Sequence, residues 1–169
     1  GNAGDLIVTA ENKFEIISSP VNISLGGEGR KGLSSKTEEE ATGNGGNIIV
    51  ESPEITISGI GGIDSSTKGF GDGGTVTILT DRLNIIEGAA VLSNTRSSGN
   101  AGEIFIQASE FIEISNKLSD TRFNLPPRPP GGIIADIRRG NTEDGSGGKI
   151  TLETARFTLR DGAFITTDT

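Results

Sequence analysis

The sequence contains no cysteine, histidine, methionine, tryptophan or tyrosine. Without cysteine there can be no disulfide and no thiolate nucleophile, and without cysteine and histidine the usual ligands of zinc, copper and haem are missing. The lack of histidine also excludes catalytic triads that depend on an imidazole base. We therefore expect a protein that is not an enzyme and that has no catalytic residue, no cofactor and no metal site.

Positive charge and long apolar runs are also scarce. The chain has 15 Lys and Arg residues and 23 Asp and Glu residues, so its net charge is −8. This negative charge argues against a nucleic-acid partner or an anionic membrane surface as partner. No run approaches the ~18 apolar residues of a membrane span. Because the chain contains no methionine, we expect an internal or processed segment of a longer protein. Its 169 residues predict one structural unit, residues 1–169.

Glycine, by contrast, is abundant, with 26 residues. Ten of the glycines open or close a four-residue signature that recurs five times and that we expect to form structural turns. The copies are Gly1-Asn2-Ala3-Gly4, Gly43-Asn44-Gly45-Gly46, Gly71-Asp72-Gly73-Gly74, Gly99-Asn100-Ala101-Gly102 and Gly145-Ser146-Gly147-Gly148. They begin 42, 28, 28 and 46 residues apart, which predicts a 28-residue repeat with insertions in the first and fourth copies.

Three short segments with apolar residues at a spacing of two follow each signature, as in β-strands. The first apolar pairs are Leu6 and Val8, Ile48 and Val50, Val76 and Ile78, Ile104 and Ile106, and Ile150 and Leu152. The second segment follows a polar break, with one extra residue and a predicted bulge in repeats one and four. It includes Phe14, Phe111 and Phe157, which we expect to stack as an aromatic column in the core. The third segment is clearest at residues 61–65, 89–93 and 163–167, and we expect Ile134 at the place of Ile63 and Val91.

Three strands per repeat cannot bury a core alone, but stacked repeats can share one. Parallel strands joined by crossovers are almost always right-handed. The sequence therefore predicts an all-β, right-handed parallel β-helix, a solenoid of about five coils of ~28 residues. The position after the first glycine holds Asn, Asp or Ser in every copy, and such side chains can form a hydrogen-bonded ladder along the stack.

Two loop insertions interrupt this pattern, at about residues 26–42 and 119–132. The first is polar and rich in glycine and charge, which predicts an exposed loop. The second is rich in proline, which predicts a stiff extended arm. The arm carries the candidate binding residues, and two arginines follow it. These five residues are Phe123, Leu125, Arg128, Arg138 and Arg139.

At residues 71–95, 99–108 and 145–169 the pattern Gly-Asn-Ala-Gly-x-Ile-x-Ile, followed by Gly-Ala-x-Ile-Ser-x-x-Thr, resembles the repeats of filamentous-haemagglutinin-like exoproteins, especially the cyanobacterial ones of the two-partner secretion type. The resemblance implies a secreted or cell-surface adhesin segment that is exported through an outer-membrane β-barrel partner. It also implies a glycan or a protein on a host or cell surface as the ligand. The secretion domain of the family is not recognisable in this sequence.

Two other functions remain open. A carbohydrate-active β-helix enzyme, such as a polysaccharide lyase or hydrolase, needs clustered carboxylates. The candidates Asp64, Asp72, Glu87, Glu103 and Asp161 differ in their offsets within the repeat, so we expect them to scatter over a solvated face. A self-assembling extracellular fibre is the other alternative, because open strand edges allow copies to stack end to end. Columns of Ser and Thr at positions such as Ser65, Thr67, Ser93 and Thr95 also resemble ice-binding arrays, although β propensity explains them equally well.

Overall fold

The computed structural model describes residues 1–18, 31–96, 98–117, 131–137 and 145–168, and within these residues the chain is all-β with no helix. None of the described segments therefore provides a helix that is long and apolar enough to cross a membrane. The strands are β1 (Leu6–Thr9), β2 (Lys13–Ser18), β3 (Lys31–Ser34), β4 (Ile48–Glu51), β5 (Glu54–Gly59), β6 (Gly61–Asp64), β7 (Val76–Ile86), β8 (Ala90–Leu92), β9 (Glu103–Ser115), β10 (Gly132–Ile134), β11 (Lys149–Thr154), β12 (Phe157–Arg160) and β13 (Phe164–Thr166).

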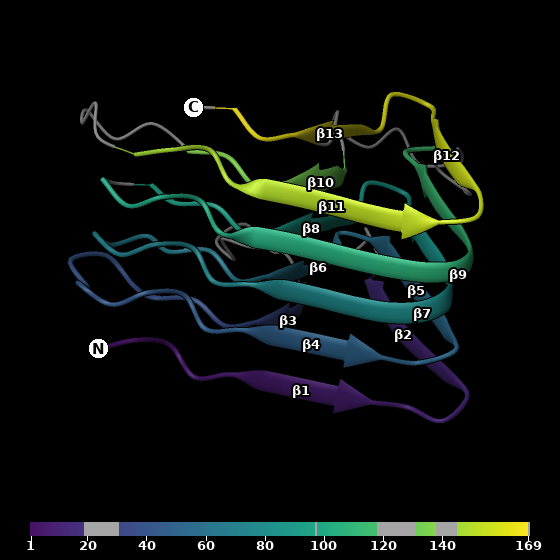
Figure 1. The fold of residues 1–169 in the computed structure, drawn as a ribbon, viewed down its shortest axis with the longest axis horizontal. Coiled ribbons are helices and arrows are strands. Elements are labelled where there is room, and N and C mark those ends of the chain that lie inside the picture. The colour runs from purple at the N-terminus through teal and green to yellow at the C-terminus, as the bar shows by residue number, and fades with distance from the viewer. Residues whose placement is uncertain (19–30, 97, 118–130, 138–144, 169) are drawn as a thin grey trace.

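Strands at the same place in successive repeats pair in parallel (Figure 1). Leu6 of β1 is in register with Ile48 of β4, and Ile48 is in register with Val76 of β7. The series continues through Ile104 of β9 to Ile150 of β11. Each partner lies at the same distance from its own glycine signature, so the spacing of the signature along the chain is also the spacing of the strand pairs.

The second and third segments of each repeat form two further parallel series. β2, β5, the second half of β7, the second half of β9 and β12 make the second series. β3, β6, β8, β10 and β13 make the third. Because β7 and β9 run through both the first and the second series, these two series belong to one eight-stranded sheet, while the third is a five-stranded sheet.

One apolar core lies between the three series of strands. It draws Ile48 and Val50 from the first series, Ile55 and Ile57 from the second and Ile63 from the third, and all five side chains are fully buried. Their spacing of two residues along each strand turns every second side chain inward, as the sequence predicted. The apolar side chains of the first and last repeats, such as Leu6 and Ile150, pack against this cluster but are only partly buried.

The signature glycines form two columns in which the backbones of successive repeats approach closely. A Cβ atom on Gly46, Gly74, Gly102 or Gly148 would lie 2.1–2.2 Å from the carbonyl oxygen of the equivalent glycine in the preceding repeat. The opening glycines make a parallel column with the corresponding distances at 2.1–2.6 Å. Since these glycines do not have positive φ angles, the requirement for glycine in the later repeats is steric.

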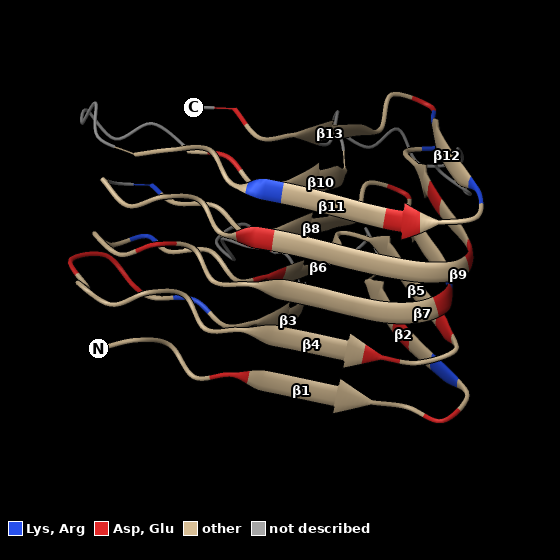
Figure 2. Cartoon of the chain, in the orientation of Figure 1, with Lys and Arg blue, Asp and Glu red and all other residues tan. Residues whose placement is uncertain are grey.

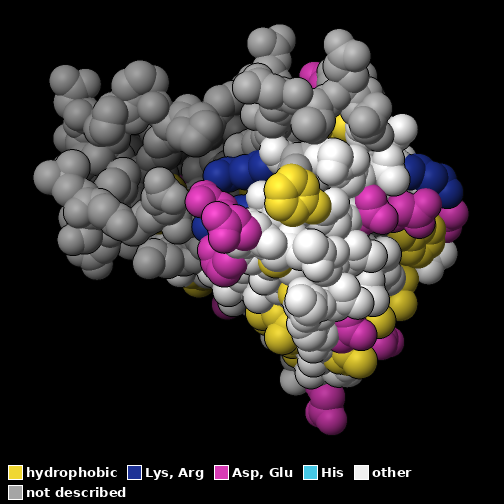
Figure 3. Space-filling view, turned by 90° about the vertical axis from the view of Figure 1, so that its left-hand side faces the viewer, with side chains coloured by type: hydrophobic (Ala, Val, Ile, Leu, Met, Phe, Trp, Pro, Cys, Tyr) yellow, Lys and Arg dark blue, Asp and Glu magenta, His cyan; other side chains and the backbone are white. Residues whose placement is uncertain are grey.

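The residue after the first glycine forms the hydrogen-bonded ladder that the sequence predicted. The side-chain oxygens of Asn2, Asn44, Asp72 and Asn100 each accept a hydrogen bond from the backbone N–H of the equivalent residue in the next repeat, ending at Ser146. The N···O distances are 3.0, 3.0, 2.7 and 3.0 Å. Figure 3 views the molecule from the side where the connections that precede the first strands lie. On this side the charged side chains form separate groups among uncharged atoms.

Removing one rung of this ladder should weaken the stack measurably. Asn44→Ala leaves the N–H of Asp72 without its side-chain acceptor, and we expect a loss of roughly 1 kcal/mol in the free energy of unfolding. Urea denaturation followed by circular dichroism measures it. Asn84→Ala, in the outward-facing part of β7, is the matched control. Equal losses in the two variants would contradict a specific role for the ladder.

The predicted limits of the first insertion are wrong at their carboxyl end. Lys31 to Ser34 form strand β3, which pairs with Gly61 to Asp64, and Thr37 bridges Thr67. Residues 31–37 thus belong to the third segment of the first repeat and not to an exposed loop. Ser18 and Lys31 are 13 positions apart, whereas their register partners Gly59 and Gly61 are 2 apart. Most of the inserted length therefore precedes Lys31, outside the described residues.

The second insertion ends earlier than predicted, and the register that follows it differs by one residue. Gly132 already belongs to β10, and Ile133, not Ile134, is in register with Val91. Ile133 is fully buried in the main core, whereas Ile134 contributes to a small cluster with Ala90 and Leu92 on the other side of the five-stranded sheet. Two adjacent isoleucines satisfy a spacing of two equally well, so the pattern alone could not choose between them.

The predicted aromatic column does not form. Phe14 and Phe157 lie in the inward series, but the member contributed by repeat four is Ile112. The predicted bulge is the reason. The register shifts between Thr80 and Arg82, and the extra residue of repeat four places Phe111 opposite Arg82. The ring of Phe111 instead has the guanidinium of Arg156 5.3 Å from its centroid.

Candidate functional site

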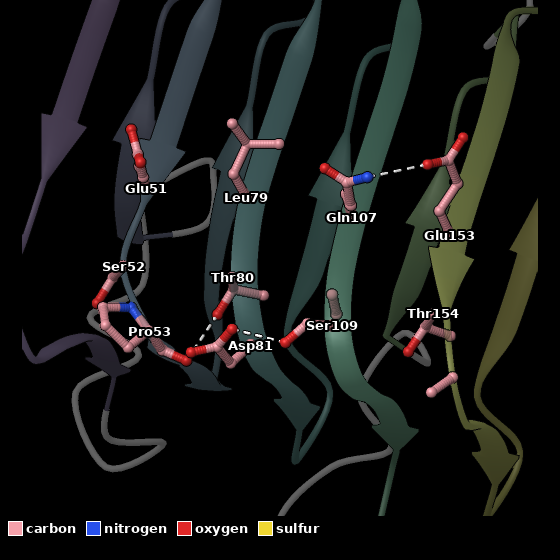
Figure 4. Close-up of a pocket in the computed structure, with 12 residues that line it drawn as sticks. Glu51, Ser52, Pro53, Leu79, Thr80, Asp81, Gln107, Ser109, Glu153 and Thr154 are labelled. Atoms are coloured by element: carbon pink, nitrogen blue, oxygen red, sulfur yellow. Dashed lines mark hydrogen bonds between the residues drawn. The ribbon is translucent and has the colours of Figure 1, made fainter.

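A groove follows the corner between the first and second series of strands, and we call it the corner groove. It crosses repeats two to five and has a volume of about 650 Å³. Its lining consists of Glu51, Ser52, Pro53, Leu79, Thr80, Asp81, Gln107, Ala108, Ser109, Glu153, Thr154 and Ala155. Figure 4 shows four of the side chains in a row across neighbouring strands, from Glu51 through Leu79 and Gln107 to Glu153, which are register partners.

The corners between the first and second strands of successive repeats create the groove. In repeats two and five a short segment separates the two strands, whereas β7 and β9 continue through the corner as single strands, and these corners stack on one another. The carbonyl oxygen of Pro53 accepts a hydrogen bond of 3.1 Å from the hydroxyl of Thr80 and another from the N–H of Asp81. Because repeat four has an extra residue at this point, Ser109 and Glu110 stand where repeat three has Asp81 alone.

Polar contacts between repeats fix several groove side chains. The Ser109 hydroxyl donates to Oδ1 of Asp81 at 2.6 Å, and Nε2 of Gln107 donates to Oε2 of Glu153 at 3.1 Å (Figure 4). Glu51, at the end of β4, is exposed. Carboxylates, an amide and hydroxyls in one open groove can exchange hydrogen bonds with a ligand rich in hydroxyl groups. The groove has the donors and acceptors that a glycan chain would need.

Sequence reasoning missed this groove. In the sequence the segments between the first and second strands read only as polar breaks, although Ser-Pro at Ser52, Thr-Asp at Thr80 and Ala-Ser at Ala108 occupy equivalent places. The groove could have been predicted by aligning the repeats at their 28-residue spacing, because the polar segments then fall at equivalent positions. Stacking turns them into a continuous surface, which no single repeat contains.

The predicted binding arm lies outside the described residues. Phe123, Leu125, Arg128, Arg138 and Arg139 all fall in the ranges 118–130 and 138–144. Their role in binding stays a prediction.

The carboxylates considered for catalysis lie in different surroundings. Asp64 is buried at the end of β6, where Nζ of Lys36 is 2.8 Å from its Oδ2. Asp72 belongs to the signature ladder. Glu103 is exposed at the start of β9. Within the described residues no group of three carboxylates could hold a metal ion.

Glu87 and Asp161 do not scatter as predicted but occupy the same corner, two repeats apart. Ile86 and Arg160 are both in register with Ser115, so the residues that follow them are equivalent. Both have positive φ angles, 60° and 57°, and each precedes a glycine that also has positive φ. Two consecutive residues of this kind make the tight turn in which Asp-Gly and similar pairs are favoured. Their shared geometry is a structural feature of the turn.

Asp161 is held as a carboxylate. The Ser115 hydroxyl donates to its Oδ2 at 2.7 Å, and Nη1 of Arg160 lies 2.7 Å from the same oxygen. The hydrogen bond from Ser115, with a further contribution from Arg160, lowers the pKa of Asp161 below its ordinary value of 3.8. Since the pKa is lowered in the folded state, the stabilisation is present above pH 3.8 and is lost as the pH falls through the folded-state pKa.

Ser115→Ala should therefore raise the pKa of Asp161 towards its ordinary value, because the variant removes the main cause of the shift. Titration of the side-chain carboxyl carbon by NMR measures this. Ser109→Ala removes a comparable hydroxyl donor at Asp81 and should leave the titration of Asp161 unchanged. An unchanged pKa of Asp161 in Ser115→Ala would show that the hydroxyl is not the cause.

The columns of Ser and Thr are interior features. Ser65, Thr67, Ser93 and Thr95 are fully buried. The hydroxyls of Ser65 and Ser93 donate to carbonyl oxygens of signature glycines, Gly46 in the first case. Hydroxyl groups that are buried inside the molecule cannot contact ice, so the ice-binding interpretation is wrong for these columns. The two serine hydroxyls satisfy backbone carbonyls at the glycine corners instead, and the Thr67 hydroxyl pairs with the hydroxyl of Thr37.

In comparisons with known protein families, with curated proteins and with solved structures, the chain has no match.

Proposed function

We propose that the chain is a right-handed parallel β-helix that acts as a stiff structural and adhesive segment of a secreted or surface-displayed bacterial exoprotein of the filamentous-haemagglutinin-like type. The observation that carries the proposal is the repetition of the same contacts between successive repeats. Each interface has a parallel register in the three strand series, a close approach at the glycine corner and a rung of the Asn/Asp ladder. A chain built from identical neighbour contacts extends in one direction.

The distribution of charge supports a role in presenting a surface. In the first series of strands, charged side chains lie at the strand ends and in the connections, and the middle of β1, of β4, of β11 and of the first halves of β7 and β9 carries none (Figure 2). This leaves a continuous uncharged sheet face beside the corner groove. A long face of this kind, bordered by hydrogen-bonding side chains, suits an extended neutral ligand such as a cell-surface glycan. Export through an outer-membrane partner is part of the same proposal and depends on the resemblance of the repeats.

The adhesive role is tested by coating beads with the chain and measuring their adhesion to a glycan array and to cells. One variant deletes residues 123–130, and a second combines Asp81→Ala with Gln107→Ala in the corner groove. Thr56→Ala with Asn84→Ala changes two outward-facing side chains of the second series and is the matched control. Loss of adhesion in one of the first two variants, with adhesion retained in the control, assigns binding to that surface. Absence of adhesion by the unmodified chain would contradict the adhesive role and leave the structural one.

A further inference from the structure

A small pocket lies where the chain leaves the third strands of repeats one to three, and we call it the third-strand pocket. Its volume is about 60 Å³, which gives room for a few water molecules or for one small group of a ligand. The polar side chains that line it include Lys36, Asp64, Ser66, Lys68, Asn94 and Arg96. None of them belongs to the corner groove, so the two are separate places on the molecule.

Stacking brings basic side chains of three repeats to this pocket. The residues that bridge the repeats at this corner are Thr37, Thr67 and Thr95. Lys36 comes directly before this column, and Lys68 and Arg96 come directly after it. Lys68 and Arg96 are thus equivalent residues of adjacent repeats, and their like charges repel each other. Hydrogen bonding to Glu38 raises the pKa of Lys68, and the charge of Arg96 opposes this rise. An anion bound between the two cations would relieve their repulsion.

The hydrogen-bond acceptors of the pocket already have donors from the protein. Oδ1 of Asp64 accepts from the backbone N–H of Ser66 at 3.1 Å, and Nζ of Lys36 is 2.8 Å from its Oδ2. The hydroxyl oxygen of Ser66 accepts from the N–H of Asn94 at 3.1 Å. Oδ1 of Asn94 in turn accepts from the N–H of Asp136 at 3.0 Å. The pocket therefore has little need of a ligand that donates hydrogen bonds.

The donors of the pocket, by contrast, remain available. Within the described residues no acceptor pairs with Nδ2 of Asn94 or with the O–H of Ser66, and no carboxylate pairs with the exposed guanidinium of Arg96. Asn94 is only 3% exposed, and the bond to its Oδ1 fixes which side of the amide is left for the pocket. Nζ of Lys68 is held by Glu38 alone, at 3.0 Å, and the side chain of Glu38 is 80% exposed.

We propose that the third-strand pocket binds one oxyanion group, a carboxylate or a sulfate. Nδ2 of Asn94 and the hydroxyl of Ser66 donate hydrogen bonds to this group, and Arg96 and Lys68 supply the positive charge. An oxyanion accepts hydrogen bonds and donates none, which matches a pocket with filled acceptors and available donors. The group belongs either to a free anion or to an acidic sugar. The site does not depend on the adhesive role or on the corner groove.

An NMR titration of the isotope-labelled intact chain tests the proposal at constant ionic strength. The probes are sulfate, acetate, galacturonate and, as the neutral control, galactose. We expect saturable shifts of the side-chain amide of Asn94 and of the backbone N–H of Arg96 with the anions and none with galactose. Tighter binding of galacturonate than of acetate would identify an acidic sugar as the source of the group, and equal binding a free anion. If no anion shifts these signals saturably, the proposal is wrong.

Two substitutions should weaken binding without disturbing the fold. Arg96→Gln should lower the affinity for the anions about tenfold, because it removes charge-assisted hydrogen bonds. Asn94→Asp should abolish binding, since it replaces the amide donor by a carboxylate but keeps the acceptor for the N–H of Asp136. Aspartate fits this place in the stack, because Oδ1 of Asp136 accepts from the N–H of Asp168 at 2.9 Å in the next repeat. Circular dichroism verifies folding.

Two further variants separate the pocket from the overall charge of the chain. Arg82→Gln removes an exposed arginine outside the pocket, one that pairs with Glu110, and should leave the affinity unchanged. Glu38→Gln should raise the affinity, because it releases Lys68 from its ion pair. Equal losses in Arg82→Gln and Arg96→Gln would overturn the proposal, since any cation would then serve. The adhesion experiment changes neither Asn94 nor Arg96, so the two proposals fail separately.

Discussion

Gly74→Val is expected to destabilise the protein by roughly 3 kcal/mol or to prevent folding. A Cβ at this position would lie 2.2 Å from the carbonyl oxygen of Gly46 and 2.2 Å from Oγ of Ser65. Neither contact can be relieved by rotating a long side chain, because one atom is backbone and the other is held by its hydrogen bond to Gly46. The second and third repeats would have to separate, and the register pairs and core contacts on both sides would weaken.

Gly4→Val is the matched control for this prediction. It makes the same substitution at the same place of the signature, but in the repeat where the Cβ meets nothing within 4 Å. Urea denaturation of dilute samples, followed by circular dichroism because the chain contains no Trp or Tyr, should give a midpoint close to that of the unmodified protein. Similar destabilisation by the two substitutions would mean that backbone conformation, and not close approach, requires glycine.

Ile78→Ala is expected to cost about 3 kcal/mol of unfolding free energy. Ile78 is fully buried and lies in the inward column between Val50 and Ile106. Truncation leaves a cavity in the middle of the stack, where repeats above and below hold the strands in place and limit their collapse. Since stability in a repeat protein depends on contacts between neighbours, the loss weakens the coupling of both halves.

Ile7→Ala provides the comparison on the same series of strands. Ile7 is 72% exposed on the outer face of β1, and its truncation should change the stability by no more than about 0.5 kcal/mol. The two variants are compared by urea midpoint at constant slope. Equal effects would show that the alternation of inward and outward side chains has been assigned wrongly.

The features that repeat in the sequence could be predicted because each of them occurs in five copies. The first apolar pairs, the glycine signature and the Asn/Asp position are regular enough for equivalent residues to be aligned from the sequence alone. In-register stacking follows, because parallel pairing of equivalent strands is the arrangement that buries every apolar pair. The bulge in repeat four was also predictable from the single residue by which its spacing differs.

The errors lie where one copy departs from the pattern. Strand β3 has Leu33 as its only large apolar residue, so its sequence reads as a polar loop, and its pairing with β6 makes it a strand. Ile133 and Ile134 are chemically the same, and only the register with Val91 distinguishes them. The ring of Phe111 suggests alignment with the other phenylalanines, although the bulge moves Ile112 into the inward column. In each case tertiary pairing decides between local alternatives.

The candidate site could be predicted less well than the fold. The corner groove consists of corner segments from four repeats, and its geometry arises only when Pro53, Asp81 and Ser109 are stacked. The predicted arm at Phe123 to Pro130 is inferred from composition, and it lies outside the described residues. A repeating pattern predicts repeating contacts, whereas binding depends on the places where the repeats differ.

The stacking of the repeats in their 28-residue register is tested most directly by engineered cysteine pairs, since the chain has no cysteine of its own. Thr56 and Asn84 are register partners in adjacent strands, and Glu113 follows one strand further on. Adjacent strands are ~4.8 Å apart, within the reach of a disulfide, and a pair two strands apart is beyond it. Under mild oxidation Thr56→Cys with Asn84→Cys should form an intramolecular disulfide, and Thr56→Cys with Glu113→Cys should not. The opposite result, or equal cross-linking of both pairs, would contradict the stacked architecture.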